Sequence, residues 1–96
     1  MPLGEVTIGC AANPEADLAG YRIYCGQSAL VLSFLQEFPV ASLPNPSAPA
    51  MRCTTFPFYG TLFFAVTAYD TSNNESGLSA VVSKAVAPRL YPLSWP

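Results

Sequence analysis

The sequence predicts an all-β domain, an antiparallel β-sandwich, from three observations. Apolar and polar residues alternate in several short runs, as they do in strands with one buried face. Clusters of Pro, Gly, Asn and Asp separate these runs and mark turns. The chain has 96 residues, which is room for one sandwich and no second domain.

The first half of the chain contains two strand patterns and one ambiguous run. The segment "GEVTIGCAA" alternates over residues 4–11 and "YRIYCG" over residues 21–26, with the turn-forming "NPEADLAG" between them. The run "SALVLSFLQEF" places its apolar residues at spacings that suit one face of a helix, with Ser28 as the N-cap, but it also fits an edge strand. Residues 29–38 are therefore predicted as either a helix or an edge strand. The proline-rich "PVASLPNPSAPA" that follows is predicted as an extended loop.

The second half reads as three strands. The segment "AMRCTTF" forms a short strand, and "TLFFAVTAYD" over residues 61–70 is the most regular strand of the sequence. The polar "TSNNESG" is its turn, and "LSAVVSKAV" over residues 78–86 is the returning strand. In the turn, Asp70 and Asn73 suit hydrogen bonds from side chain to backbone, and Asn73 or Asn74 is expected to have a positive φ.

Composition disfavours two classes of partner. Charged residues make up only 10% of the chain, whereas an average soluble domain has about 25%. A net charge of -2 with four scattered Lys and Arg residues gives no basic stripe for nucleic acid. No apolar run approaches the roughly 18 residues that span a bilayer, and the first residues lack the pattern of a secretory signal. We therefore expect neither nucleic-acid binding nor membrane insertion.

Two segments resemble a known family. "ADLAGYRIYCG" and "LFFAVTAYDTSNNESGLSAVVS" resemble the C strand and the F-turn-G hairpin of a fibronectin type III domain, especially the bacterial and phage forms, and the resemblance covers about Glu5 to Lys84. It implies an immunoglobulin-like antiparallel β-sandwich over residues 1–87, with a long Pro-rich connection from strand C through C′ to E. An extended tail over residues 88–96 would follow. Such modules serve many unrelated roles, so the resemblance implies a fold more than a function.

The sequence departs from this family at three places. Cys10 stands where the family usually has a buried Trp on strand B, and Leu62 stands where it has the Tyr that corners strand F. Only "MPLG" precedes Glu5, so most of strand A is expected to be lacking. Strand B would then present a row of unpaired backbone groups, with only Glu5 to discourage strand addition. Either another chain or the chain's own tail would cover this edge.

No residues suggest catalysis. The chain has no His, and the alternation places Cys10, Cys25 and Cys53 on inward faces, where small buried thiols are the first interpretation. A disulfide between Cys10 and Cys53, on the neighbouring strands B and E of the family, is the second. The carboxylates of the loops are expected to cap turns; they are Glu15, Asp17, Asp70 and Glu75. We expect a non-enzyme with no metal and no cofactor.

The last residues, "APRLYPLSWP", are too apolar for a solvated tail. Pro88, Pro92 and Pro96 prevent a regular continuation of the preceding strand. The segment should therefore lie against its own domain or dock on a partner, and we favour the partner.

Two functional hypotheses follow. The first is a structural protein of a virion or similar assembly, for example a small accessory component of a phage capsid, neck, tail or baseplate. Its partners would be other protein chains, including further copies of itself, bound through Arg89, Leu90, Tyr91, Leu93, Trp95, Glu5 and Thr7. The alternative is a carbohydrate-binding or adhesion module, at the bacterial cell surface or extracellular, whose stacking platforms would be Tyr24, Tyr59, Tyr69 or Trp95.

Overall fold

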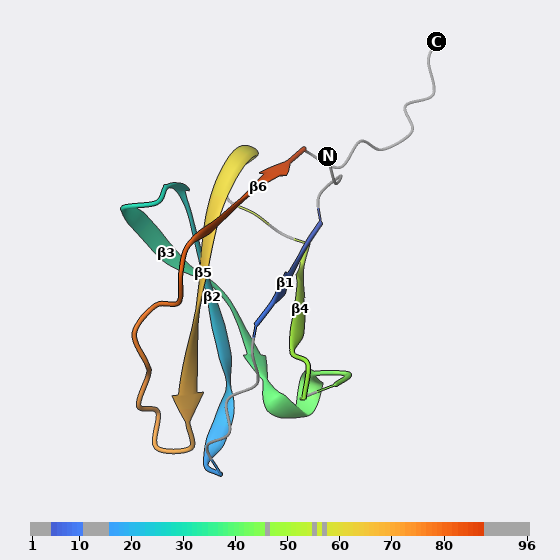
Figure 1. Ribbon diagram of the computed structural model, residues 1–96, viewed down its shortest axis with the longest axis vertical. Helices are drawn as coiled ribbons and strands as arrows, with labels where there is room; N and C mark the ends of the chain where they lie inside the picture. Colours follow the sequence, from blue (N-terminus) through green and yellow to red (C-terminus); the bar gives the residue numbers. More distant parts are fainter. Residues whose placement is uncertain (1–4, 11–15, 46, 55, 57, 88–96) are drawn as a thin grey trace.

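Six strands in two antiparallel sheets make up the part of the chain that the structure describes (Figure 1). The computed structural model describes residues 5–10, 16–45, 47–54, 56 and 58–87. The strands are β1 (Val6–Gly9), β2 (Leu18–Ser28), β3 (Val31–Pro39), β4 (Ala50–Cys53), β5 (Gly60–Asp70) and β6 (Val82–Val86). One 3-10 turn, η1 (Val40–Ser42), follows β3. The prediction of an all-β fold with antiparallel sheets is confirmed.

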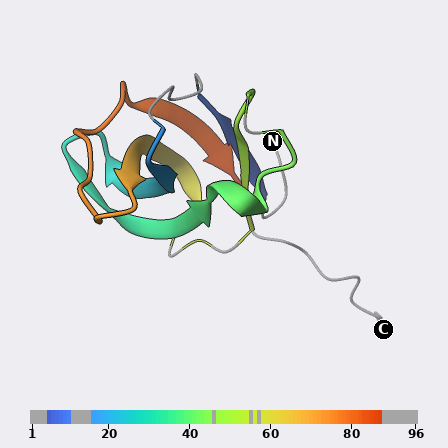
Figure 2. The same cartoon turned by 90° about the horizontal axis from the view of Figure 1, so that it is seen from below.

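The smaller sheet contains β1 and β4, and the larger has the order β3-β2-β5-β6. In the smaller sheet Val6 pairs with Cys53 and Ile8 with Met51. In the larger sheet β2 and β5, the two long central strands, pair over most of their length. Figure 2, seen from below, shows the β1–β4 pair beside the curved four-stranded sheet.

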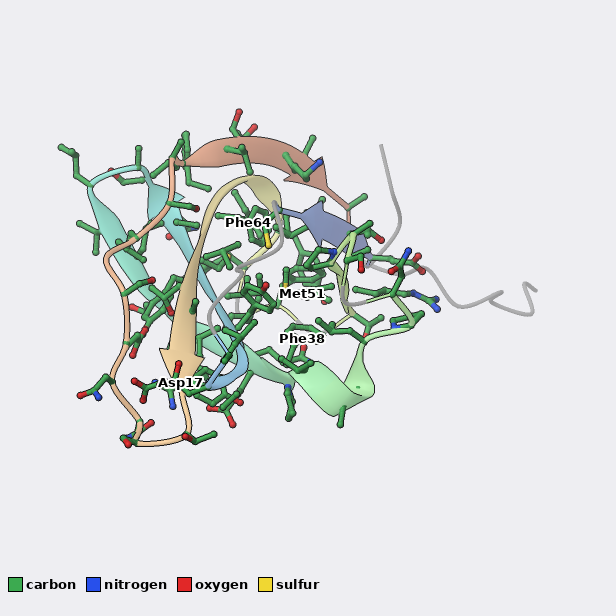
Figure 3. The ribbon with its side chains drawn as sticks, turned by 60° about the horizontal axis from the view of Figure 1, so that its bottom comes forward. Asp17, Phe38, Met51 and Phe64 are labelled. Carbon is green, nitrogen blue, oxygen red and sulfur yellow. The ribbon has the colours of Figure 1, made fainter. Side chains whose placement is uncertain are left out.

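The core lies between the two sheets and follows the predicted alternation. Ile23 of β2, Met51 of β4 and Leu62 and Phe64 of β5 are fully buried. Figure 3 shows Met51 and Phe64 in the central space between the sheets, from opposite layers. Alternate residues on these strands reach the core because successive side chains of a strand point to opposite faces.

The ambiguous run over residues 29–38 is an edge strand, β3. Its partly buried residues are Leu32, Leu35 and Phe38, which recur every three residues instead of every two. The register against β2 shifts between Ile23 and Tyr24, so that one extra residue of β3 is accommodated there. This bulge interrupts the alternation and gives the strand a spacing that resembles a helix.

The returning strand is shorter than the predicted residues 78–86, because β6 begins only at Val82. Before β6, two serines bond to β5 in place of a regular strand ladder. Ser76 N–H donates to the Ala68 carbonyl (2.8 Å), and Ser76 Oγ accepts from Ala68 N–H (2.9 Å). Ser79 makes the same two bonds with Val66, both at 2.9 Å. Three residues of this segment thus span two residues of β5, so a regular ladder cannot form.

Candidate interaction surface

The edge of β1 that faces away from β4 has no partner strand among the described residues. Cys10 N–H donates to the Pro49 carbonyl (3.2 Å), so Cys10 directs its backbone groups toward β4. Backbone groups alternate between the two edges of a strand, which places those of Thr7 and Gly9 on the other edge. No described residue pairs with that edge. Four backbone groups are therefore available to an added strand.

A hollow of about 210 Å³ lies beside this edge. Its lining is mostly apolar and comes from three strands: Ile8 and Cys10 at β1, Phe64 and Val66 of β5, and Val82 of β6. Val82 pairs directly with the buried Phe64, so both side chains are on the inner face, yet Val82 remains 44% exposed. We call this hollow, with the open edge of β1, the β1–β6 groove.

Of the two predicted binding residues at β1, Thr7 lies at the edge of this groove and Glu5 does not. Thr7 is exposed and contributes the open backbone groups. Glu5 forms an ion pair with Arg52 of β4 (2.6 Å) and is therefore turned toward the paired side of the strand. This leaves the open edge without a charged side chain, and a charge is one of the usual obstacles to strand addition. Strand β6 differs, because Lys84 pairs with the buried Leu62 and so is on the inner face of the sheet. An inward-pointing charge of this kind discourages the addition of a strand to β6.

The other predicted binding residues, Arg89, Leu90, Tyr91, Leu93 and Trp95, lie outside the described residues. The prediction that strand A is lacking concerns residues 1–4, which also lie outside them. Figure 1 shows that β6, which leads into the tail, ends at the same end of the molecule at which β1 begins.

Further exposed apolar side chains lie at and after the β2–β3 turn. Leu30 is 93% exposed and Phe34 is 55% exposed, and Val31 lies between them. Edge strand β3 carries one charged side chain, Glu37, along its nine residues. Phe34 packs edge-on against Tyr24 on the outer face of the sheet, whereas Val31 borders a hollow with the buried Cys25, so these exposed side chains do not form one patch.

The outer face of the four-stranded sheet carries a polar network that the sequence reasoning missed. Glu75 accepts hydrogen bonds from Thr67 Oγ1 (2.6 Å), from the Tyr24 hydroxyl and from Arg22 Nη1 (2.9 Å). Arg22 also bonds to Glu37 Oε1 (2.9 Å). The register of β2 against β5 pairs Arg22 with Thr67, and the turn region supplies Glu75 as the partner of both, a meeting that the linear sequence does not show.

This network fixes the turn segment against the sheet. The hydrogen bond from Thr67, then that from Tyr24, and then Arg22 lower the pKa of Glu75. The same contact raises the pKa of Tyr24. Arg22 Nη2 also donates to Asn73 Oδ1 (2.6 Å). The lowered pKa keeps the carboxylate ionised among these donors, and the bonds hold it against the sheet.

The turn matches the prediction for Asp70 and for the positive φ, whereas the Asn73 side chain bonds to Arg22 instead of to the backbone. Asp70 Oδ1 accepts from the backbone N–H groups of Ser72 (2.9 Å) and Asn74 (2.8 Å), and these bonds, the one from Asn74 first, lower the pKa of Asp70. Asn73 has φ 65°, the left-handed conformation expected for one of the two asparagines. Asp17, Asp70 and Glu75 also border a shallow hollow of about 280 Å³. Both Asp70 and Glu75 are engaged in the bonds described above.

The three thiols are free. Cys25 and Cys53 are buried, and burial raises the pKa of Cys53 to about 11. Cys10 is only half-buried, so its predicted inward position holds in part. The alternative of a Cys10–Cys53 disulfide is wrong because the register pairs Cys53 with Val6, while Cys10 lies beside Pro49 at the far end of β1.

Two of the four aromatic residues proposed as stacking platforms have other contacts. The Tyr24 hydroxyl bonds to Glu75, and the Arg22 guanidinium lies over the Tyr69 ring, 4.1 Å from its centroid. Tyr59 is half exposed, and Trp95 lies outside the described residues.

Within the part of the chain that the structure describes, no three His, Cys, Asp or Glu side chains gather as a metal site. The same residues include no helix with the length and apolar character to cross a membrane. No protein-family model matches the sequence, and comparison with curated proteins and with solved structures finds no match.

Proposed function

We propose that this chain is a non-enzymatic interaction module of the fibronectin type III type that is built into an assembly of protein chains, such as a virion. The strand order supports this type: β1 and β4 would correspond to strands B and E, and β2, β5 and β6 to strands C, F and G. β3 would be strand C′, with the Pro-rich connection between it and β4.

The observation that carries the proposal is the open edge of β1 beside an apolar groove. A two-stranded sheet is marginally stable by itself, and an uncharged open edge favours addition of another strand. Thr7 and Gly9 supply the unpaired groups, and Val82 supplies exposed apolar surface on an inner face. A partner chain would satisfy both requirements at once.

Three further features favour an assembly over a free module. The charged fraction is only 10%. Two further exposed apolar side chains, Leu30 and Phe34, lie on a different part of the fold. The tail over residues 88–96 has four large apolar side chains and only one charged side chain. Proteins that are surrounded by neighbours can keep such surfaces because the neighbours cover them.

The tail is the proposed anchor. Burial of Tyr91, Leu93 and Trp95 would remove on the order of 400 Å² from water, worth up to about 10 kcal/mol gross before the cost of ordering is subtracted. That is sufficient to hold a small domain in place.

The test is truncation after Val86, with mass by light scattering and thermal unfolding as the two measurements. A matched full-length control, Ser94→Ala, keeps the apolar side chains. We expect the full chain and the control to associate and the truncated chain to be a folded monomer. A truncated chain that unfolds would place the tail on its own sandwich, and one that associates like the full chain would eliminate the tail as the anchor.

A further inference from the structure

We propose that residues 91–95 of a second copy of this chain form a third strand of the β1–β4 sheet, running parallel to β1 in the β1–β6 groove. The inference rests on the proposed function and names its partner as another copy of the same chain. It follows from the backbone of β1, from the positions of the prolines in the tail and from the short link between β6 and the tail.

The prolines of the tail are compatible with a strand at an edge. Pro88, Pro92 and Pro96 are four residues apart, so in an extended strand all three direct their nitrogen atoms to the same side. The residues of the other parity include Tyr91 and Leu93 and have intact N–H groups. A strand of this sequence can pair along one side only, with its prolines toward solvent, as prolines in edge strands are placed.

Antiparallel pairing would leave the apolar side chains of the tail in solvent. Residues that face each other in an antiparallel pair have their side chains on the same face of the sheet. Thr7 and Gly9 are exposed and point away from the core. If Tyr91 and Leu93 bonded to them in antiparallel fashion, both side chains would point to solvent.

Parallel pairing places the same side chains in the groove. In a parallel pair, a residue bonds to the two residues that flank the one opposite it. With Pro92 opposite Thr7, the Thr7 N–H donates to the Tyr91 carbonyl and the Leu93 N–H donates to the Thr7 carbonyl. With Ser94 opposite Gly9, the Gly9 N–H donates to the Leu93 carbonyl and the Trp95 N–H donates to the Gly9 carbonyl. All four open backbone groups are then paired, and the side chains of the bonded tail residues point inward.

The groove has room for them. Its volume is about 210 Å³, and a protein cavity of about 150 Å³ is large enough to hold benzene. One aromatic side chain of the tail therefore fits against Ile8, Phe64 and Val82. The added strand would also cover the exposed side chain of Val82.

The link between β6 and the tail favours a second copy. A tail that returned to its own β1 would have only residues 88–90 in which to reverse direction and cross between sheets that pack about 10 Å apart. Pro88 keeps the residue before it, Ala87, in an extended conformation. Short links under such strain favour exchange of the segment between copies.

The test compares the full chain with three full-length variants by light scattering and thermal unfolding. Leu93→Pro removes an N–H that faces β1, and its matched control Ser94→Pro removes one that faces solvent. The third variant inserts about six Gly and Ser residues after Ala87, which lets the tail reach its own groove.

We expect the full chain and Ser94→Pro to have at least twice the mass of the 10.2 kDa monomer. Leu93→Pro should weaken self-association about tenfold or more, since it removes a paired donor and a buried side chain. The insertion variant should be a monomer that unfolds at the same temperature as the full chain.

Three results would overturn the inference. The first is a monomeric full chain that Leu93→Pro destabilises and Ser94→Pro does not, because the tail then lies in its own groove. The second is an insertion variant that associates as strongly as the full chain. The third is self-association that Leu93→Pro leaves unchanged. In this third case the proposed function still stands if truncation after Val86 abolishes association, and fails with the inference if it does not.

Discussion

Replacement of Glu75 by Gln tests whether the polar network holds the turn segment to the sheet. The carboxylate accepts from Thr67 and Tyr24 through one oxygen and from Arg22 through the other. A Gln amide has one acceptor oxygen, so either the two hydroxyls or the guanidinium must face an NH₂ group. Thr67 is only 3% exposed, which leaves its hydroxyl little access to water as a substitute.

The expected cost is about 1–2 kcal/mol, the value of one or two hydrogen bonds to a charged group after a discount for the partial exposure of Glu75. For a domain of this size, that lowers the unfolding temperature by about 5–15 °C. The assay is thermal unfolding followed by circular dichroism at pH 7. The control is Glu5→Gln, whose ion pair with Arg52 is exposed and should contribute no more than about 0.5 kcal/mol.

The same pair of proteins gives a pH test. The folded state lowers the pKa of Glu75, so the stabilisation is present above the unfolded value of about 4.3 and is lost as pH falls through the lower folded value. The difference in unfolding free energy between the wild type and Glu75→Gln should therefore be full at pH 7. It should shrink as the pH falls below the unfolded value and through the lower folded value. A Glu75→Gln variant as stable as the wild type at pH 7, or a Glu5→Gln variant equally damaged, would refute this account.

Three other substitutions test the core and the turns. Cys25→Ser should cost about 1–3 kcal/mol by burying a hydroxyl, with Cys25→Ala milder, and a thiol reagent should label Cys10 well before Cys25; equal labelling rates would contradict the burial. Asn73→Gly should be nearly neutral and Asn73→Val should cost about 1–3 kcal/mol in chemical denaturation, because φ is 65°; a tolerated Val would contradict that geometry. Gly26→Ala should cost about 1–3 kcal/mol in the same measurement, since its Cβ would lie 2.0 Å from the Val31 carbonyl oxygen; Gly77→Ala, with open space around it, should cost nothing.

Local pattern was sufficient for the strands that lie across the core. The strands β1 and β4 bury alternate residues, as the alternation in the sequence predicts, whereas β5 also buries residues of its outer face, among them Ala65 and Thr67. The turn after β5 was also readable, since the bonds of Asp70 and the φ of Asn73 involve only residues within four positions of each other. These features depend on neighbours in the chain, which the sequence shows directly.

The alternation in the sequence could not decide whether the third element, β3, is a strand or a helix. Two register shifts against β2, between Ile23 and Tyr24 and between Cys25 and Ser28, interrupt the alternation of β3, and its partly buried residues recur every three positions, which a helix also approximates. These shifts are a property of how β3 meets β2. Pairing with β2 therefore decides between helix and strand, and the residues 29–38 by themselves do not show it.

The sequence by itself determined the alternating strands, the turn chemistry and the apolar character of the tail. The tertiary structure alone decided the register that keeps Cys10 and Cys53 apart, the bonds that join Glu75 to Thr67, and the edge of β1 that remains open. The physical reason is distance along the chain. Alternation and turn residues act over a few positions, whereas β1 and β4 pair across more than forty residues, and which backbone groups they leave unpaired is fixed only when the two strands meet.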